Sequence, residues 1–143
     1  MSSIDQDGAN DQFLTNGKRI VLTPTLRPDQ GSIVFMSYEH RRPSIYIYDR
    51  GRRQQRVVLG SETLNLSFAP RFSPDGRWIL FSMAKAGNTD LYRVSVSGGT
   101  PQQLTNSPGI DTGGSFSPDG SKIVFESDRS GSQQVYVMNA DGS

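Results

Sequence analysis

The chain has 143 residues, of which 34% are apolar, and it contains 15 glycines and 8 prolines. This composition is ordinary for a small all-β domain with frequent turns and is low for a helical bundle. The formal net charge of +1 excludes a general attraction to nucleic acid or to anionic membranes. The absence of cysteine excludes disulfides and thiolate metal sites. No apolar stretch reaches the roughly 20 residues of a membrane-spanning helix.

The first predicted element is a strand at Gln12–Thr15, within a short segment formed by residues 4–15. Two parts of this segment recur later in the chain: residues 13–16 resemble residues 103–106, and residues 4–8 resemble residues 138–142. The segment therefore repeats the outer strand of a larger unit without the rest of that unit. Residues 1–7 lack the basic and apolar regions of a secretory signal, so we expect a protein that stays where it is made or one that begins after a removed segment.

Three repeats follow, over residues 16–59, 60–105 and 106–143. Each has a turn-opening proline and, later, a tyrosine in an apolar run, and both recur at intervals of 46 and then 44 residues. The prolines are Pro28, Pro74 and Pro118, and the tyrosines are Tyr46, Tyr92 and Tyr136. A period near 44 residues indicates the blades of a β-propeller.

Each repeat predicts four strands. Pro and Gly in the Pro-Asp-Gly turn preset the backbone angles of a hairpin. The strand before this turn, such as Phe68–Phe72, is predicted to be the innermost strand of its blade. The strand after it, Trp78–Ser82 or Ile123–Ser127, is a continuous apolar run, which predicts burial on both faces. The third strand carries the tyrosine, and the fourth is weaker, at Arg56–Leu59 and Gln102–Thr105. The predicted fold class is an all-β propeller with three four-stranded blades.

Residues Leu104–Gly142 contain Phe-Ser-Pro-Asp-Gly, Ile-Val-Phe, Ser-Asp-Arg and Tyr-Val-Met in that order. This pattern resembles the PD40 or WD40-like repeat of TolB-type propellers and, more loosely, the propellers of tricorn protease and prolyl-oligopeptidase-like peptidases. The likeness to the TolB type extends over residues 4–143. It implies a six-bladed propeller preceded by a small α/β domain, located in the bacterial periplasm, that binds the peptidoglycan-associated lipoprotein of the Tol-Pal system.

The chain departs from that family in having three blades and neither a leading domain nor a signal, which predicts an excised or engineered fragment, cytoplasmic as expressed. Three blades cannot surround an axis without strain, and the third repeat stops at Ser143 before its fourth strand. We therefore expect a homodimer with six blades, with a nine-bladed trimer less favoured. The expected closure residues are Gln12, Phe13, Leu14 and Thr15 of one copy and Val135, Tyr136 and Val137 of another.

Catalytic and metal-binding patterns are weak, so we predict a protein that is not an enzyme and has no cofactor. His40 is the single histidine, and no Gly-x-Ser-x-Gly motif occurs. Asp5, Asp7 and Asn10 suggest an acidic loop, but the Glu that ends a calcium loop is missing, and turn formation explains these residues better. A cation on the channel axis stays open as an alternative.

Four arginines, Arg50, Arg52, Arg53 and Arg56, form the densest basic cluster. They could hold an acidic partner or nucleic acid, but charges on an outer edge strand also prevent unwanted pairing between sheets, and we favour this structural role. Aromatic residues at one repeat phase are assigned to packing between blades rather than to ligand stacking.

The predicted binding face lies where the loops after the second strands and between blades converge, because these loops are polar and differ among repeats. The candidate partner-binding residues are Glu39, His40, Arg42, Lys85, Asn88, Asp111, Asp128 and Arg129. The leading hypothesis is a protein- or peptide-binding propeller assembled from two chains, with neither nucleic acid nor a membrane as a partner. The alternatives are a structural fragment without a ligand and the gating propeller of a peptidase.

Overall fold

The computed structural model describes residues 2–3, 12–15, 20–39, 42–60, 62 and 67–143. These residues form thirteen β-strands in four antiparallel sheets, and this part of the chain contains no helix. Accordingly, nothing in the described residues has the helical length and apolar character needed to cross a membrane. The predicted all-β class is confirmed.

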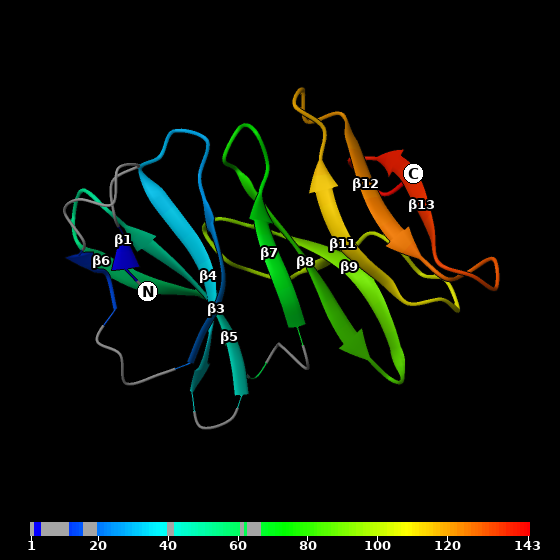
Figure 1. Ribbon diagram of the computed structural model, residues 1–143, viewed down its shortest axis with the longest axis horizontal. Coiled ribbons are helices and arrows are strands. Elements are labelled where there is room, and N and C mark those ends of the chain that lie inside the picture. Colours follow the sequence, from blue (N-terminus) through cyan, green and yellow to red (C-terminus); the bar gives the residue numbers. More distant parts are fainter. Residues whose placement is uncertain (1, 4–11, 16–19, 40–41, 61, 63–66) are drawn as a thin grey trace.

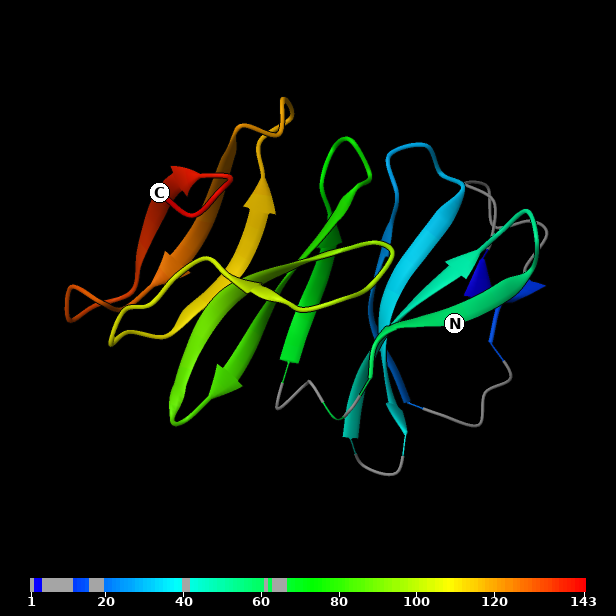
Figure 2. The ribbon, with the colours of Figure 1, turned by 180° about the vertical axis from the view of Figure 1, so that it is seen from behind.

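Three of the sheets stand side by side in chain order, and the two termini lie at opposite ends of the row (Figure 1, and from behind Figure 2). The first sheet consists of β3 (Ile20–Leu26), β4 (Ser32–Glu39), β5 (Arg42–Asp49) and β6 (Gln54–Leu59). The second sheet consists of β7 (Ser67–Phe72), β8 (Trp78–Lys85), β9 (Asn88–Ser95) and β10 (Gln102–Gln103). The third sheet consists of β11 (Asp111–Phe116), β12 (Lys122–Ser127) and β13 (Gln134–Asn139). Each sheet is an up-and-down meander, and the innermost strands β3, β7 and β11 face the same side of the row.

The Pro-Asp-Gly turns join the first two strands of the second and third sheets, as predicted. Gly76 and Gly120 have φ angles of 69° and 74°, which glycine adopts without steric cost. Asp75 and Asp119 each accept a hydrogen bond from the serine two residues earlier and from the backbone amide two residues later. We call the end of the sheets that carries these turns the turn end, and the opposite end the loop end.

Each innermost strand contains a bulge at the same repeat position. The register shifts lie between Leu22 and Thr25 in β3, and between the corresponding residues in β7 and β11. Thr23, Ala69 and Gly113 have positive φ angles of 49°, 55° and 66° at these shifts. A bulge bends the strand and increases its twist, so the three sheets share a deformation that the hydrophobic pattern did not reveal.

The core lies between the sheets rather than within one of them. One cluster joins residues of the first and second sheets, including Val34, Ile45, Ile79 and Phe81. A second cluster joins the second and third sheets through Leu80, Leu91, Leu104, Ile123 and Phe125. In each sheet a phenylalanine stacks on the repeat tyrosine: Phe35 on Tyr46, Phe81 on Tyr92 and Phe125 on Tyr136, with ring centroids 5.6, 6.0 and 5.8 Å apart. The predicted packing role of the aromatic repeats is confirmed.

The prediction that the second strand of every repeat is buried on both faces is wrong for the third sheet. β8 is buried over consecutive residues, but burial alternates along β12. The reason is that among the described residues no further sheet covers the outer face of the third sheet. Val124, Val135 and Val137 are exposed on that face.

The predicted strand at Gln12–Thr15 is shorter in the structure. β2 (Gln12–Phe13) pairs with β1 (Ser2–Ser3), and the Phe13 side chain is 84% exposed. Leu14 follows β2 and packs, together with Val21, against Phe35 and the Tyr46 and Tyr48 rings of the first sheet.

Candidate functional site

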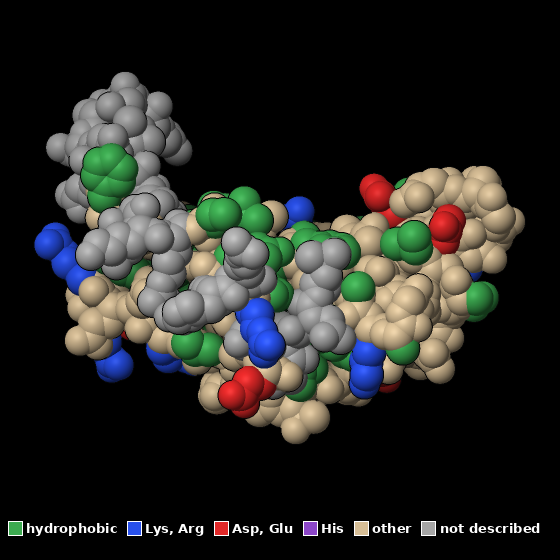
Figure 3. Space-filling model, turned by 90° about the horizontal axis from the view of Figure 1, so that it is seen from below, with side chains coloured by type: hydrophobic (Ala, Val, Ile, Leu, Met, Phe, Trp, Pro, Cys, Tyr) green, Lys and Arg blue, Asp and Glu red, His purple; other side chains and the backbone are tan. Residues whose placement is uncertain are grey.

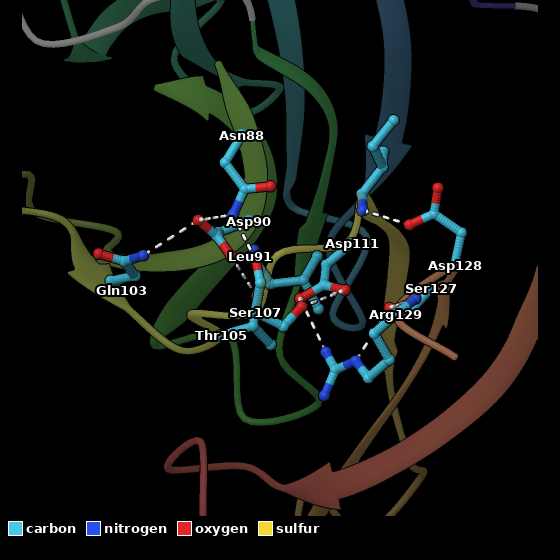
Figure 4. Close-up of polar contacts among 11 residues, drawn as sticks. Asn88, Asp90, Leu91, Gln103, Thr105, Ser107, Asp111, Ser127, Asp128 and Arg129 are labelled. Carbon is cyan, nitrogen blue, oxygen red and sulfur yellow. Dashed lines mark hydrogen bonds and ion pairs between the residues drawn. The ribbon is translucent and has the colours of Figure 1, made fainter. Parts of the chain in front are cut away.

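The loop end of the second and third sheets brings together four of the eight predicted binding residues: Asn88, Asp111, Asp128 and Arg129 (Figure 4). Asn88 begins β9, Asp111 begins β11, and Asp128 and Arg129 directly follow β12. These strand ends converge because the connection between the second and third sheets returns the chain to the loop end.

Asp111 and Arg129 form the main ion pair of this cluster. The Asp111 side chain is fully buried, and its Oδ2 lies 2.8 Å from Nη2 of Arg129. The Ser107 hydroxyl donates to the same carboxylate, and Arg129 Nε donates to Ser127 Oγ at 2.9 Å. A buried charge is tolerated only when it is paired and hydrogen-bonded in this way. The pair therefore fastens the inter-blade loop to the end of β12.

Arg129 also packs on aromatic side chains. Its guanidinium carbon lies 5.1 Å from the centre of the Phe125 ring and 4.8 Å from that of Tyr136. A cation over a ring face is attracted by the ring's negative π surface. Arg129 consequently connects the polar cluster to the stacked pair in the core of the third sheet.

Asp90, in β9, is a second buried carboxyl group of the cluster. It accepts hydrogen bonds from Asn88, Gln103 and Thr105, but among the described residues no Lys or Arg forms an ion pair with it. Burial raises the pKa of Asp90 above its usual value, and the nearby negative charge of Asp111 adds to the increase. The surroundings of Asp90 therefore destabilise its charged form.

Backbone contacts close the cluster. Asn88 Nδ2 also donates to the Ser107 carbonyl, and the Ile110 amide donates to Asp128 Oδ1 at 2.7 Å. A Cβ atom at Gly109 would lie 2.6 Å from the Arg129 backbone nitrogen, so only glycine permits this approach of the two loops. Asn88 thus ties the second sheet to the inter-blade connection, and Asp128 ties that connection to the end of β12 in the third sheet.

The polar side chains of this cluster are engaged with one another. Within the described ranges no buried side-chain nitrogen or oxygen lacks a hydrogen-bond partner, and no group of three or more His, Cys, Asp or Glu could hold a metal ion. The arrangement stabilises the loop end of the second and third sheets.

The other predicted binding residues have different environments. Lys85 and Arg42 are exposed at the loop end, at the end of β8 and the start of β5. Glu39 ends β4, but its side chain lies outside the described residues, as does all of His40. The structure therefore places Lys85 and Arg42 on an accessible surface, where Lys85 lies opposite Asn88 at the end of the β8–β9 hairpin and so borders the cluster.

The predicted closure residues lie at the two ends of the row. Gln12, Phe13, Leu14 and Thr15 stand beside the first sheet, whereas Val135, Tyr136 and Val137 belong to β13 of the third sheet. The Val135 and Val137 side chains are 70% and 66% exposed, and Tyr136 is half-buried on Phe125. Val124 completes this exposed group, because it pairs with Val137 across β12 and β13.

Sequence reasoning missed a cavity at the turn end between the first and second sheets, which Arg27, Arg52 and Arg56 help to line. The four-arginine cluster was the available signal, but the cavity depends on two neighbouring sheets. Among the described residues on the side of the molecule that Figure 3 shows, Lys and Arg side chains stand in separate groups.

Comparison with known proteins assigns this architecture to a family. The family model described as the TolB beta propeller domain matches residues 1–143. The chain belongs to the TolB β-propeller family. It is 45% identical over 109 residues to the Tol-Pal system protein TolB of Gluconobacter oxydans, which covers 76% of this chain and 24% of that protein. The chain thus spans about a quarter of the length of this relative.

Solved structures agree with the family assignment. TolB from Acinetobacter baumannii has a TM-score of 0.86 and 35% identity, covering 99% of this chain and 35% of that one. An oligogalacturonate lyase from Vibrio parahaemolyticus has a TM-score of 0.76 at 16% identity, covering 97% of this chain and 41% of the lyase. At that level of identity the likeness to the lyase shows a shared fold alone.

Proposed function

We propose that this chain is part of a TolB-type propeller that serves as a non-catalytic, protein-binding scaffold of the Tol-Pal system in the periplasm. The observation that carries the proposal is the match to the TolB propeller family over all 143 residues. The ion pair of Asp111 with Arg129 supports it, because a buried pair that fixes the loop end of the third sheet suits a rigid scaffold. The proposed partner is the peptidoglycan-associated lipoprotein.

The proposed binding surface is the loop end, where Lys85 and Arg42 are exposed. Loops on a rigid frame commonly carry recognition, and exposed basic side chains favour a partner with an acidic surface. Isothermal titration with the soluble domain of the lipoprotein from Gluconobacter oxydans tests this proposal. We expect saturable heat, and weaker binding after Lys85→Gln.

Lys122→Gln is the matched control, because Lys122 is also an exposed lysine but begins β12 at the turn end. Its affinity for the lipoprotein should equal that of the unmodified chain. The absence of heat at about 100 μM of both proteins, a concentration that detects dissociation constants far weaker than micromolar, would contradict the binding function.

We further propose that two copies of the 143-residue chain complete a six-bladed ring. Val124, Val135 and Val137 support this, because the residues at the same repeat positions in the first sheet, Val34, Ile45 and Ile47, are buried by the next sheet. Exposed apolar surface of this kind favours association. Light scattering should give the mass of two chains, and the mass of one chain at all concentrations would contradict the dimer.

The proposed exchange places β2 of one copy beside β13 of the other. In the second sheet, Gln102 of the outer strand pairs with Arg93. The corresponding repeat positions hold Gln12 and Val137. We therefore expect Gln12 of one copy to lie opposite Val137 of the other once β2 has separated from Ser2–Ser3. The chain has no cysteine, so the pair Gln12→Cys with Val137→Cys should form a disulfide-linked dimer under mild oxidation. The pair Gln12→Cys with Val124→Cys is the control, since β12 does not border β2 in this arrangement.

A further inference from the structure

A cavity of about 310 Å³ opens at the turn end between the first and second sheets. Seven of its ten lining residues are polar or charged, including Asp49, and the other three are Ile47, Phe72 and Val96. We call these three apolar residues its floor, and the lining arginines Arg52 and Arg56 its rim. The cavity lies at the end of the sheets opposite the loop surface of the proposed function.

The cavity exists because two repeat positions differ between the sheets. Ser32 and Ile47 line it, and 46 residues later the corresponding positions hold Trp78 and Arg93. In the next interface the Arg93 guanidinium covers the Trp78 ring at 4.5 Å, and the hollow that remains is about 170 Å³. The small Ser32 side chain leaves the space that an indole fills in the second sheet.

The charges around the two hollows also differ. Three arginines, Arg27, Arg52 and Arg56, line the first hollow together with Asp49. The second hollow is instead lined by Asp75 and Asp119 with one arginine, Arg93. The lining of the first hollow is therefore net positive and attracts anions, whereas that of the second is net negative.

Donor groups are available at the rim. The Arg52 side chain is 82% exposed, and its closest carboxylate, that of Asp49, is 4.0 Å away. Arg56 uses one nitrogen for the Val96 carbonyl across the interface. Because a guanidinium has five N–H donors, both side chains retain donors for a ligand carboxylate.

β6 adds an edge to this site. It is the last strand of the first sheet, so one side of its backbone has no neighbouring strand among the described residues. Gln54, Gln55 and Arg56 belong both to β6 and to the cavity wall. An exposed strand edge can pair with an extended peptide, whose alternate side chains then enter adjacent pockets.

We infer that this groove binds an extended acidic peptide, with carboxylates on Arg52 and Arg56 and an apolar side chain on the floor of Ile47, Phe72 and Val96. The apolar floor distinguishes this ligand from free phosphate and from a nucleic-acid backbone, neither of which has an apolar side chain to bury. The site is independent of the Tol-Pal partner and of ring closure, because both of its walls belong to one chain.

Fluorescence anisotropy with a labelled Glu-Leu-Glu-Leu-Glu peptide tests the inference at about 50 mM salt, where electrostatic attraction is only partly screened. We expect saturable binding that weakens with added salt. The matched Gln-Leu-Gln-Leu-Gln peptide should bind about tenfold more weakly, as expected for the loss of charge-assisted hydrogen bonds. Equal binding of the two peptides, or binding of neither, overturns the inference.

Two variants assign the binding to this groove. Arg52→Gln should weaken binding of the acidic peptide about fivefold. Arg77→Gln should leave it unchanged, although Arg77 has the same 82% exposure and lies 4.0 Å from its own aspartate, Asp75. Equal weakening in both variants indicates attraction by surface charge in general and overturns the site.

The variant Ser32→Trp gives the first sheet the tryptophan that the second sheet has at the corresponding position, Trp78. It should abolish binding because the indole fills the cavity. If this variant does not fold, the pair Arg52→Gln and Arg77→Gln still decides the question. Competition identifies the ligand class. An acidic peptide is contradicted as the ligand if inorganic phosphate displaces the labelled peptide at concentrations where free glutamate does not. It is also contradicted if a single-stranded oligonucleotide binds more tightly than the peptide.

Discussion

The second and third sheets carry the same pattern of apolar residues but bury it differently. Leu80 and Leu91 of the second sheet are fully buried, whereas Val124 and Val135, 44 residues later, are 39% and 70% exposed. Their strands, turns and stacked aromatic pairs are alike. The difference arises from what lies beside them: Ile123 and Phe125 cover the leucines, and no described sheet covers the valines. In a repeat protein, a residue is therefore part of the core only when its neighbouring repeat is present.

The largest expected effect follows directly from this comparison. Leu91→Ala should lower the free energy of unfolding by about 3 kcal/mol, because it removes a buried side chain and leaves a cavity. Val135→Ala should lower it by less than about 0.5 kcal/mol at concentrations where the chain is monomeric. Urea unfolding of both variants measures the difference. Equal losses would show that the outer face of the third sheet is covered within one chain.

The ion pair between Asp111 and Arg129 at the loop end of the third sheet gives the next largest effect. Arg129→Met leaves the Asp111 carboxylate buried without a cation, and we expect a loss of about 2 kcal/mol, reduced because the Arg129 side chain is 30% exposed. Adding Asp111→Asn should recover part of the loss, since a neutral amide needs no counter-ion. A double-mutant cycle by urea unfolding measures the coupling, and purely additive losses would contradict it.

The glycines of the two Pro-Asp-Gly turns provide a further comparison of the second and third sheets. Gly120→Ala should cost about 1 kcal/mol, because alanine is strained at this positive φ angle. Gly76→Ala should cost a similar amount, since its φ angle is alike and the atom that its Cβ would approach, Arg27 Nε at 2.4 Å, ends a flexible side chain that can move aside. Thermal unfolding of the two variants tests this, and a loss at Gly76 that clearly exceeds the loss at Gly120 would show that Arg27 is held rigidly against the turn.

The smallest expected effect is a difference in pH dependence between interface and turn carboxyl groups. The raised pKa of Asp90 means that the native state binds this proton more readily than the unfolded chain, so the destabilising contribution of Asp90 is relieved as the pH falls through its native pKa. Hydrogen bonds from Ser117 and Ser121 lower the pKa of Asp119 to about 2. The stability due to Asp119 is present above its unfolded pKa of 3.8 and is lost as the pH falls toward about 2.

Two substitutions separate these effects. Asp119→Asn should make the free energy of unfolding fall less steeply between about pH 4 and pH 2 than it does in the unmodified chain. Asp90→Asn should remove the increase in the free energy of unfolding that the protonation of Asp90 contributes as the pH is lowered toward about 4. Urea unfolding at a series of pH values measures both slopes. Variants with the same pH profile as the unmodified chain would contradict the assignment of the two carboxyl groups.

Sequence reasoning predicted that Asn88, Asp111, Asp128 and Arg129 lie near one another among the loops, and they do meet at the loop end. Their role in binding a partner stays a prediction. Their residue types, however, are equally suited to binding a partner and to pairing with one another. The burial of Asp111 and its 2.8 Å contact with Arg129 depend on how two separate loops fold back on each other, which no local pattern encodes.

The sequence by itself determined the repeat, the strands and the turn chemistry, because hydrophobic patterns and the backbone preferences of proline and glycine act over a few residues. Contacts between sheets decided the rest. The exposure of Val135 and the cavity beside Ser32 both depend on which sheets face each other, in positions about 44 to 46 residues apart in the chain. Such contacts are set by tertiary packing, since the space left by a small side chain exists only when a second sheet encloses it.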